Sequence, residues 1–193
     1  MLEIIEKYAD EHKVPIINEE GLDFLFECIK QYNVKSIFEL GSAIGYSALR
    51  MSIFDPQLKI VTVEKDEERY ELAVKYLEMF DKHHQIKLFL ADALQFETNQ
   101  KFDMMFLDLA KSKYQVVLDR FYDNLNAGGI VVVDNLGMHG LVFKEQLKVR
   151  RQVRQLVEKI KAFREAIIKD DRFEVKLFDD VGDGVALLIK KGV

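Results

Sequence analysis

Short apolar runs alternate with longer amphipathic stretches along most of the chain. Five runs predict buried strands: Ser36–Leu40, Lys59–Glu64, Ile86–Leu90, Phe102–Leu107 and Ile130–Val133. Apolar residues at helical spacing predict helices over Ser47–Phe54, Asp66–Phe80, Lys113–Leu125 and Lys148–Ile168. Strands that alternate with helices are typical of crossover units. The pattern therefore predicts an α/β fold, a doubly wound and mostly parallel sheet with helices on both faces.

The two ends of the chain complete this sheet. Val175–Phe178 and Val185–Ile189 flank the turn-rich Asp180–Gly184, which predicts a hairpin, seven strands in all and an antiparallel last strand. Ahead of the first strand, Leu2–His12 and Glu19–Tyr32 have helical spacing. We expect one domain over residues 1–193, with residues 1–33 as an N-terminal helical cap. These helices either pack on the sheet edge or form a lid.

Composition narrows the class of protein. The chain has 193 residues, one cysteine and a formal net charge of −5. A single cysteine excludes an internal disulfide and favours a cytoplasmic protein. No apolar run is long enough to span a bilayer, so we expect no membrane partner. The acidic balance argues against a protein that coats nucleic acid, but it allows a local basic patch.

The turn after the first predicted strand reads ELGSAIGYS at 39–47. Gly41 and Gly45 allow a tight turn and a close ligand, next to a helix N-terminus. Ala43 and Tyr46 replace the second and third glycines of the dinucleotide fingerprint, and the second glycine serves to admit a pyrophosphate. A ligand with ribose and adenine but without pyrophosphate fits better, and S-adenosylmethionine is the common one.

The next two strand ends also carry acidic residues. Glu64 ends the second strand, where a carboxylate can accept hydrogen bonds from a ribose diol. Asp92, beside Ala93, follows the third strand, where it could meet an adenine amino group. Acidic residues at such positions also serve as caps of the following helix.

Oxygen ligands and an amine follow the fourth and fifth strands. Asp108 stands three residues before Lys111, and Asp134 is adjacent to Asn135. The ends of parallel strands meet at one sheet edge, so these side chains should converge. Carboxylate and amide oxygens suit Mg²⁺, and a lysine beside the ion can take a proton from a metal-bound hydroxyl. The sequence therefore indicates a metal-assisted enzyme that activates a hydroxyl, although Lys111 could also be a solvated surface lysine.

These motifs together resemble the metal-dependent O-methyltransferases, a class I S-adenosylmethionine-dependent family that includes catechol and caffeoyl-coenzyme A methyltransferases and small bacterial relatives. The carriers are ELGSAIGYS at 39–47, VEKD at 63–66, ADA at 91–93, FLDLAKSKY at 106–114, VDNLGMHG at 133–140 and GDGVAL at 182–187. Ser42 stands where threonine is common in the family. The resemblance implies a Rossmann-like methyltransferase fold and a homodimer.

The resemblance also assigns roles to residues. Lys111 would be the general base. Asp108, Asp134 and Asn135 would bind Mg²⁺ or Mn²⁺. The residues predicted around the cofactor are Glu39, Gly41, Ser42, Gly45, Tyr46, Ser47, Glu64, Asp92, Ala93 and Asp108.

Two methyl acceptors compete, and both carry two adjacent oxygens. One is a small catechol-like phenol. The other is 5-hydroxyuridine at the tRNA wobble position, the substrate of a bacterial subgroup of this family, whose methylation gives 5-methoxyuridine. The segment Lys144–Arg164 is strongly basic, and Lys148, Arg150, Arg151 and Arg154 are candidates for contacting RNA phosphates of the anticodon loop. Such a run can equally be a solvated helix face, and a non-catalytic nucleotide-binding protein is a third possibility.

Overall fold

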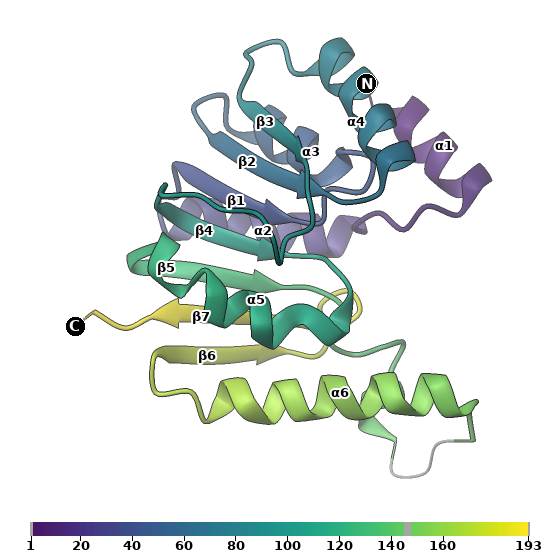
Figure 1. Ribbon diagram of the computed structural model, residues 1–193, viewed down its shortest axis with the longest axis vertical. Helices are drawn as coiled ribbons and strands as arrows, with labels where there is room; N and C mark the ends of the chain where they lie inside the picture. The colour runs from purple at the N-terminus through teal and green to yellow at the C-terminus, as the bar shows by residue number, and fades with distance from the viewer. Residues whose placement is uncertain (1, 145–147, 193) are drawn as a thin grey trace.

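The computed structural model describes residues 2–144 and 148–192 and contains a seven-stranded sheet in the order β3-β2-β1-β4-β5-β7-β6 (Figure 1). The strands that pair in parallel are β1 (Ser36–Leu40), β2 (Lys59–Glu64), β3 (Ile86–Leu90), β4 (Phe102–Leu107) and β5 (Leu125–Val133). β7 (Val185–Lys190) lies between β5 and β6 (Phe173–Phe178) and is antiparallel to both. The predicted doubly wound α/β fold with an antiparallel last strand is confirmed.

The border between the fifth helix and β5 differs from the prediction. α5 (Tyr114–Arg120) ends early, and a 3₁₀ turn, η2 (Tyr122–Asn124), leads into β5. Leu125 pairs with Phe102 in the sheet, across a register shift that precedes Met104. Because the shift lets β5 extend beyond its apolar core, the strand begins five residues before Ile130, where the continuous apolar run starts.

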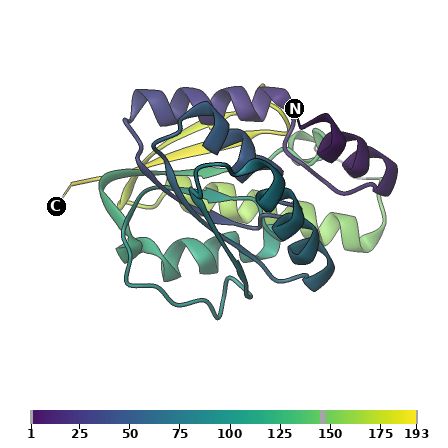
Figure 2. The ribbon, with the colours of Figure 1, turned by 90° about the horizontal axis from the view of Figure 1, so that it is seen from above.

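Helices cover both faces of the sheet, as Figure 2 shows. One face packs against α1 (Glu3–His12), α2 (Glu19–Gln31), α3 (Tyr46–Phe54) and α4 (Glu67–Phe80), and the other against α5 and α6 (Arg151–Ile168). Alternate residues of the inner strands enter the two cores, as Ile37 and Phe38 of β1 do. Lys148–Arg150 precede α6 instead of forming its first turn.

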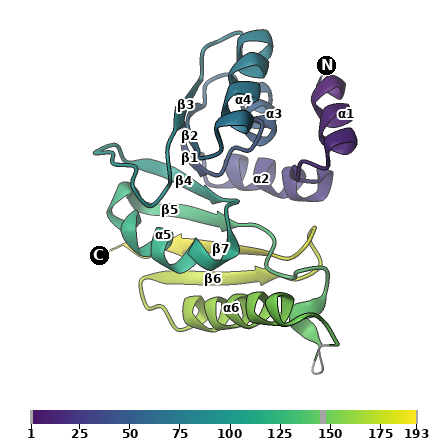
Figure 3. The ribbon, with the colours of Figure 1, turned by 45° about the vertical axis from the view of Figure 1, so that its right-hand side comes forward.

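The N-terminal helices pack beside the first half of the sheet. Asn18 caps α2 by accepting a hydrogen bond from the Gly21 backbone N–H at 2.8 Å. Tyr8 on α1 meets Tyr76 on α4 with ring centroids 6.4 Å apart, and the two helices lie side by side in Figures 1 and 3. No helix within residues 2–144 and 148–192 is long and apolar enough to cross a membrane.

Candidate active site

A cleft of about 1180 Å³ lies at the carboxyl ends of the parallel strands. The loops that follow β1, β2, β3, β4 and β5 contribute to its wall, as expected for a doubly wound sheet. Predicted site residues that line it are Gly41, Glu64, Asp92, Ala93, Asp108, Lys111, Asp134 and Asn135. The predicted general base, the metal ligands and part of the predicted cofactor set therefore share one cleft.

The three predicted metal ligands are fixed by the ends of β4 and β5. The Asp108 backbone N–H donates to Leu40 O at 3.1 Å, and the Asp134 backbone N–H donates to Leu107 O at 3.2 Å. Asn135 has a left-handed backbone with φ of 63°, and its side-chain amide donates to Asp108 Oδ1 at 3.3 Å. The Tyr114 hydroxyl, buried beneath them, donates to the backbone carbonyl of Asp134 at 2.9 Å. Asp134 Oδ1 also accepts a hydrogen bond from the Asn135 backbone N–H at 2.7 Å, so Asn135 links the two carboxylates.

The acidic groups of this cluster repel one another. Burial, together with the charges of Asp134 and Glu39, raises the pKa of Asp108 to about 7. Burial also raises the pKa of Asp134. A divalent cation would relieve this repulsion, and two carboxylates plus an amide oxygen are a donor set that suits Mg²⁺ or Mn²⁺. Within the described ranges no group of three or more His, Cys, Asp or Glu side chains is placed to hold a metal ion.

Lys111 sits among carboxylates at the start of the 3₁₀ turn η1 (Lys111–Lys113). Burial lowers the pKa of its amine, while the charges of Asp108, Asp183 and Asp134 oppose that change. Asp183 also lines the cleft, and its carboxylate accepts a hydrogen bond from the His139 backbone N–H. Sequence reasoning did not select Asp183 as a site residue. Its signal was the GDG turn at 182–184, which brings the β6–β7 hairpin to the ends of the parallel strands.

The glycine turn after β1 is packed tightly against the loop after β4, which begins with Asp108. Gly41 has φ of 101°, and a Cβ there would lie 2.2 Å from the Asp108 carbonyl oxygen. Glu64 holds the same turn, because its carboxylate accepts hydrogen bonds from the backbone N–H of Ala43 at 2.8 Å and of Asp66 at 2.9 Å. Asp92 caps its own turn by accepting from the Leu94 N–H at 2.8 Å. The structural role of each carboxylate thus coexists with its position on the cleft wall.

Five predicted cofactor residues lie behind this wall instead of on it: Glu39, Ser42, Gly45, Tyr46 and Ser47. Glu39 is fully buried and accepts hydrogen bonds from the hydroxyls of Ser47 and Thr62. The Tyr46 hydroxyl donates to Glu6 at 2.6 Å and so ties α3 to α1. Direct cofactor contact by these five residues stays a prediction, and the structure shows how they support the turn.

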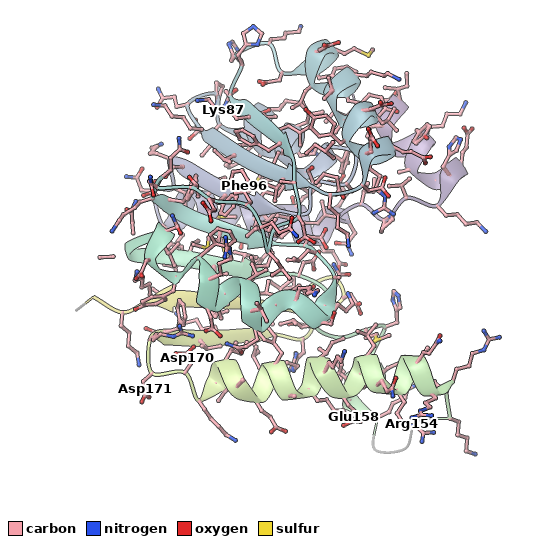
Figure 4. The ribbon with its side chains drawn as sticks, in the orientation of Figure 1. Lys87, Phe96, Arg154, Glu158, Asp170 and Asp171 are labelled. Carbon is pink, nitrogen blue, oxygen red and sulfur yellow. The ribbon has the colours of Figure 1, made fainter. Side chains whose placement is uncertain are left out.

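The predicted RNA contacts lie at and just before the start of α6. Lys148, Arg150, Arg151 and Arg154 are exposed, and Figure 4 places Arg154 and Glu158 toward that end of the helix. Glu145, the other acidic residue of the segment, lies outside the described residues. Farther along, Arg164 does not face water: its side chain is 12% exposed and pairs with Asp179 at 2.8 Å. The basic segment is thus solvated at its start and buried near Arg164.

Comparisons with known proteins agree with this arrangement. A family model described as O-methyltransferase matches residues 2–191. The caffeoyl-CoA O-methyltransferase of Populus kitakamiensis is 28% identical over 94% of this chain and 80% of its own length. A Staphylococcus aureus crystal structure, provisionally named caffeoyl-CoA O-methyltransferase, is 29% identical, with a TM-score of 0.92 over 98% of this chain and 91% of that one. The O-methyltransferase of Bacillus cereus in complex with SAH, at 20% identity, shares the fold with a TM-score of 0.81 over 98% of this chain and 90% of its own.

Proposed function

The chain belongs to the O-methyltransferase family, and we propose that it moves a methyl group from S-adenosylmethionine to a hydroxyl beside a second oxygen, aided by Mg²⁺ or Mn²⁺. Family membership confirms the predicted enzyme class and removes the support for a non-catalytic nucleotide-binding protein. One observation carries the proposal. Asp108, Asp134 and Asn135 converge beside Lys111 in the cleft that Gly41, Glu64 and Asp92 also line.

The methyl donor fits the half of the cleft formed by β1, β2 and β3. Gly41 lines this half of the cleft, and Glu64 and Asp92 offer carboxylate oxygens for a ribose and an adenine. A relative with the same fold binds SAH, the demethylated form of this donor. Glu64 would act in two ways, because it also holds the backbone of the turn through Ala43.

The acceptor fits beside Asp108, Asp134 and Asn135. A bound divalent cation would supply Lewis acidity that lowers the pKa of the acceptor hydroxyl. Lys111 takes the hydroxyl proton on Nζ, and the freed oxygen lone pair forms the new bond to the methyl carbon as the carbon–sulfur bond breaks. The fixed main chain around Asp108 and Asp134 holds the reacting oxygen in line, and such positioning can supply roughly 7–11 kcal/mol of the barrier.

We favour 5-hydroxyuridine in the tRNA anticodon loop as the acceptor. Its 5-hydroxyl and 4-carbonyl form a two-oxygen chelate, and a wobble base in a single-stranded loop can be splayed into a pocket. The exposed Lys148, Arg150 and Arg151 support this acceptor, because they follow the loop after β5 in the chain and could hold flanking phosphates.

A small catechol-like phenol is the second candidate. The Populus relative is named for a caffeoyl acceptor, whose ring carries two neighbouring hydroxyls. Such a substrate needs only the metal ligands, Lys111 and the cleft. A homodimer and a cytoplasmic location remain predictions from the sequence.

Separate kinetic measurements with each acceptor distinguish the two candidates. The protein is incubated with methyl-labelled S-adenosylmethionine, Mg²⁺ and either an anticodon stem–loop that carries 5-hydroxyuridine or 3,4-dihydroxybenzoate. We expect a higher kcat/KM for the stem–loop, with label in 5-methoxyuridine. Rapid turnover of the catechol with none of the stem–loop would overturn the RNA acceptor, and turnover of neither would refute O-methylation of both substrate classes.

A further inference from the structure

The half-exposed aromatic side chain of Phe143 faces the cleft near the loop that carries Asp134 and Asn135. Phe143 is 50% exposed and lines the cleft with Met138 and Leu156. It ends the 3₁₀ turn η3 (Leu141–Phe143), which begins six residues after Asn135. A large apolar ring left half in water beside a reaction site is available to a ligand with a flat apolar face.

The backbone beneath Phe143 is anchored to the loop after β5, which carries Asp134 and Asn135. The Val142 N–H donates to Gly137 O at 3.2 Å, and the Phe143 N–H donates to Gly140 O at 3.3 Å. Gly137 is tied in turn to the β6–β7 hairpin, because its N–H donates to Asp183 O at 2.5 Å. Val142, the residue before Phe143, is 7% exposed and packs in the core on the α5–α6 face. The ring is therefore carried on a segment with few ways to move relative to Asp134 and Asn135.

An arginine with a side chain only 12% exposed supports the ring itself. The guanidinium of Arg164 on α6 lies 5.3 Å from the centre of the Phe143 ring, within the range of cation–π contacts. Arg164 Nη2 donates to Asp179 Oδ1 at 2.8 Å, which fixes the guanidinium from the other direction. Its Nη1 is buried and has no hydrogen-bond partner among the described residues, so the contacts that hold this guanidinium are the ion pair and the Phe143 ring. The Lys161 amine holds the next residue through the Lys144 carbonyl at 3.5 Å.

We infer that Phe143 is the stacking platform for the planar ring of the methyl acceptor, and that Arg164, held by Asp179, is the positioning residue that fixes it. This inference deepens the proposed function and rests on it, since it names the element that orients the acceptor ring. Stacking sets the ring plane, while the metal ligands and Lys111 set the reacting oxygen. The exposed Lys144 follows Phe143 directly, so a stacked nucleobase would have a cation near its phosphate.

The test compares Phe143→Ala and Phe143→Tyr with the parent enzyme, with the stem–loop and 3,4-dihydroxybenzoate as acceptors. Phe143→Ala should raise KM for the acceptor that the parent methylates by roughly 5- to 150-fold, the usual loss for one base–aromatic stack, and leave the affinity for S-adenosylmethionine unchanged. Phe143→Tyr should restore KM. Phe54→Ala is the matched control, because Phe54 is also exposed, at 41%, but stacks on Phe26 away from the cleft. An unchanged KM in Phe143→Ala would overturn the platform while the methyltransferase activity stands.

The positioning role of Arg164 has its own readout. Arg164→Met should raise the same KM with little change in kcat, and Arg164→Lys should recover part of the loss because it keeps the cation but not the planar fork. Circular dichroism checks that both variants are folded. Equal KM values for Arg164→Met and the parent would remove Arg164 from this role.

A binding measurement keeps the inference separate from the proposed reaction. Proton NMR of each acceptor, added to the protein with S-adenosylhomocysteine and Mg²⁺, should show upfield ring-current shifts that vanish in Phe143→Ala. If neither acceptor is methylated but the shifts appear and depend on Phe143, the proposed acceptors fail as substrates and the platform stands. If no shift appears with either acceptor, the platform is refuted.

Discussion

At the scale of single residues, Glu39 is a buried ionisable group that makes the stability of the fold depend on pH. Its carboxyl group is fully buried and accepts hydrogen bonds from Ser47 and Thr62. Burial is the main cause that raises its pKa from 4.5 to about 7, and the hydroxyl hydrogen bonds oppose it. The folded protein therefore holds this proton more tightly than the unfolded chain does. The contribution of Glu39 to stability is largest below pH 4.5 and is lost as the pH rises through about 7.

Glu39→Gln should remove this pH dependence, because the amide keeps hydrogen-bonding atoms for both hydroxyls without an ionisable group. Relative to the parent, the variant should gain on the order of 1–3 kcal/mol of unfolding free energy at pH 8, and the gain should shrink toward pH 5. Urea denaturation at the two pH values measures it. A constant difference between the two pH values would show that Glu39 does not titrate in this window.

Lys111 is the proposed general base. Lys111→Ala should lower kcat by roughly 10²- to 10⁴-fold, because the acceptor hydroxyl loses its base, and should leave cofactor affinity nearly unchanged. The loss should shrink at high pH, where the hydroxyl ionises unaided. Steady-state kinetics across pH test this, with Lys101→Ala as a control at an exposed lysine that does not line the cleft. Wild-type kcat in Lys111→Ala would exclude it as the base.

The sequence predicted that polar residues at successive strand ends share one edge of the sheet, and the structure places them in one cleft. Asp108, Asp134 and Asn135 were found because parallel strands carry such residues to one edge. Asp183 and Arg164 were not singled out in the same way, because the contacts that define them are tertiary. Asp183 reaches the cleft only through the antiparallel hairpin, and Arg164 looked like any other cation of a basic run until it was seen buried against Asp179.

At the scale of elements, α6 combines two functions along its length. Its buried face packs through Val157, Ile160 and Phe163 into the core on the α5–α6 face, while its start presents exposed Arg151 and Arg154. The 3.6-residue period predicted the buried face and the exposed start, but not the packing of Arg164 against Asp179. It could not predict that the helix begins at Arg151 instead of Lys148, because helix ends depend on local hydrogen bonds rather than on apolar spacing.

The start of α6 gives a prediction about salt. Changing Arg150, Arg151 and Arg154 together to Gln should weaken stem–loop binding. The slope of log Kd against log salt concentration should fall by up to about 2, since each lost phosphate contact lowers that slope by about 0.7. Methylation of 3,4-dihydroxybenzoate should be nearly unaffected, if the parent has it. Fluorescence anisotropy over a range of salt concentrations measures the slope.

A charge-matched control places the effect at α6. Lys75 on α4, Lys82 in the turn after it and Lys87 on β3 are exposed outside the cleft, and their triple change to Gln alters net charge equally. This variant should keep the parent slope. Equal slopes for the α6 variant and the parent would argue that RNA does not bind there.

At the scale of the whole molecule, the strand order explains why distant motifs meet. Among the five parallel strands β1 occupies the centre, with β2 and β3 on one side and β4 and β5 on the other, so the chain reverses its winding direction at β1. The donor residues on β2 and β3 and the acceptor residues on β4 and β5 therefore flank one cleft. Hydrophobic periodicity predicted this layout, but not the β6–β7 hairpin as the element that closes the acceptor side through Asp183.

The central claim is that methyl transfer depends on a divalent cation held by Asp108, Asp134 and Asn135. The direct test is the rate of label transfer from methyl-labelled S-adenosylmethionine to the acceptor, measured with chelator, with added Mg²⁺ or Mn²⁺, and in Asp134→Ala. We predict that chelator abolishes transfer and that either cation restores it. Asp134→Ala should stay inactive with cation, yet fold and bind S-adenosylmethionine like the parent. Undiminished transfer in chelator, or parental activity in Asp134→Ala, would contradict the account.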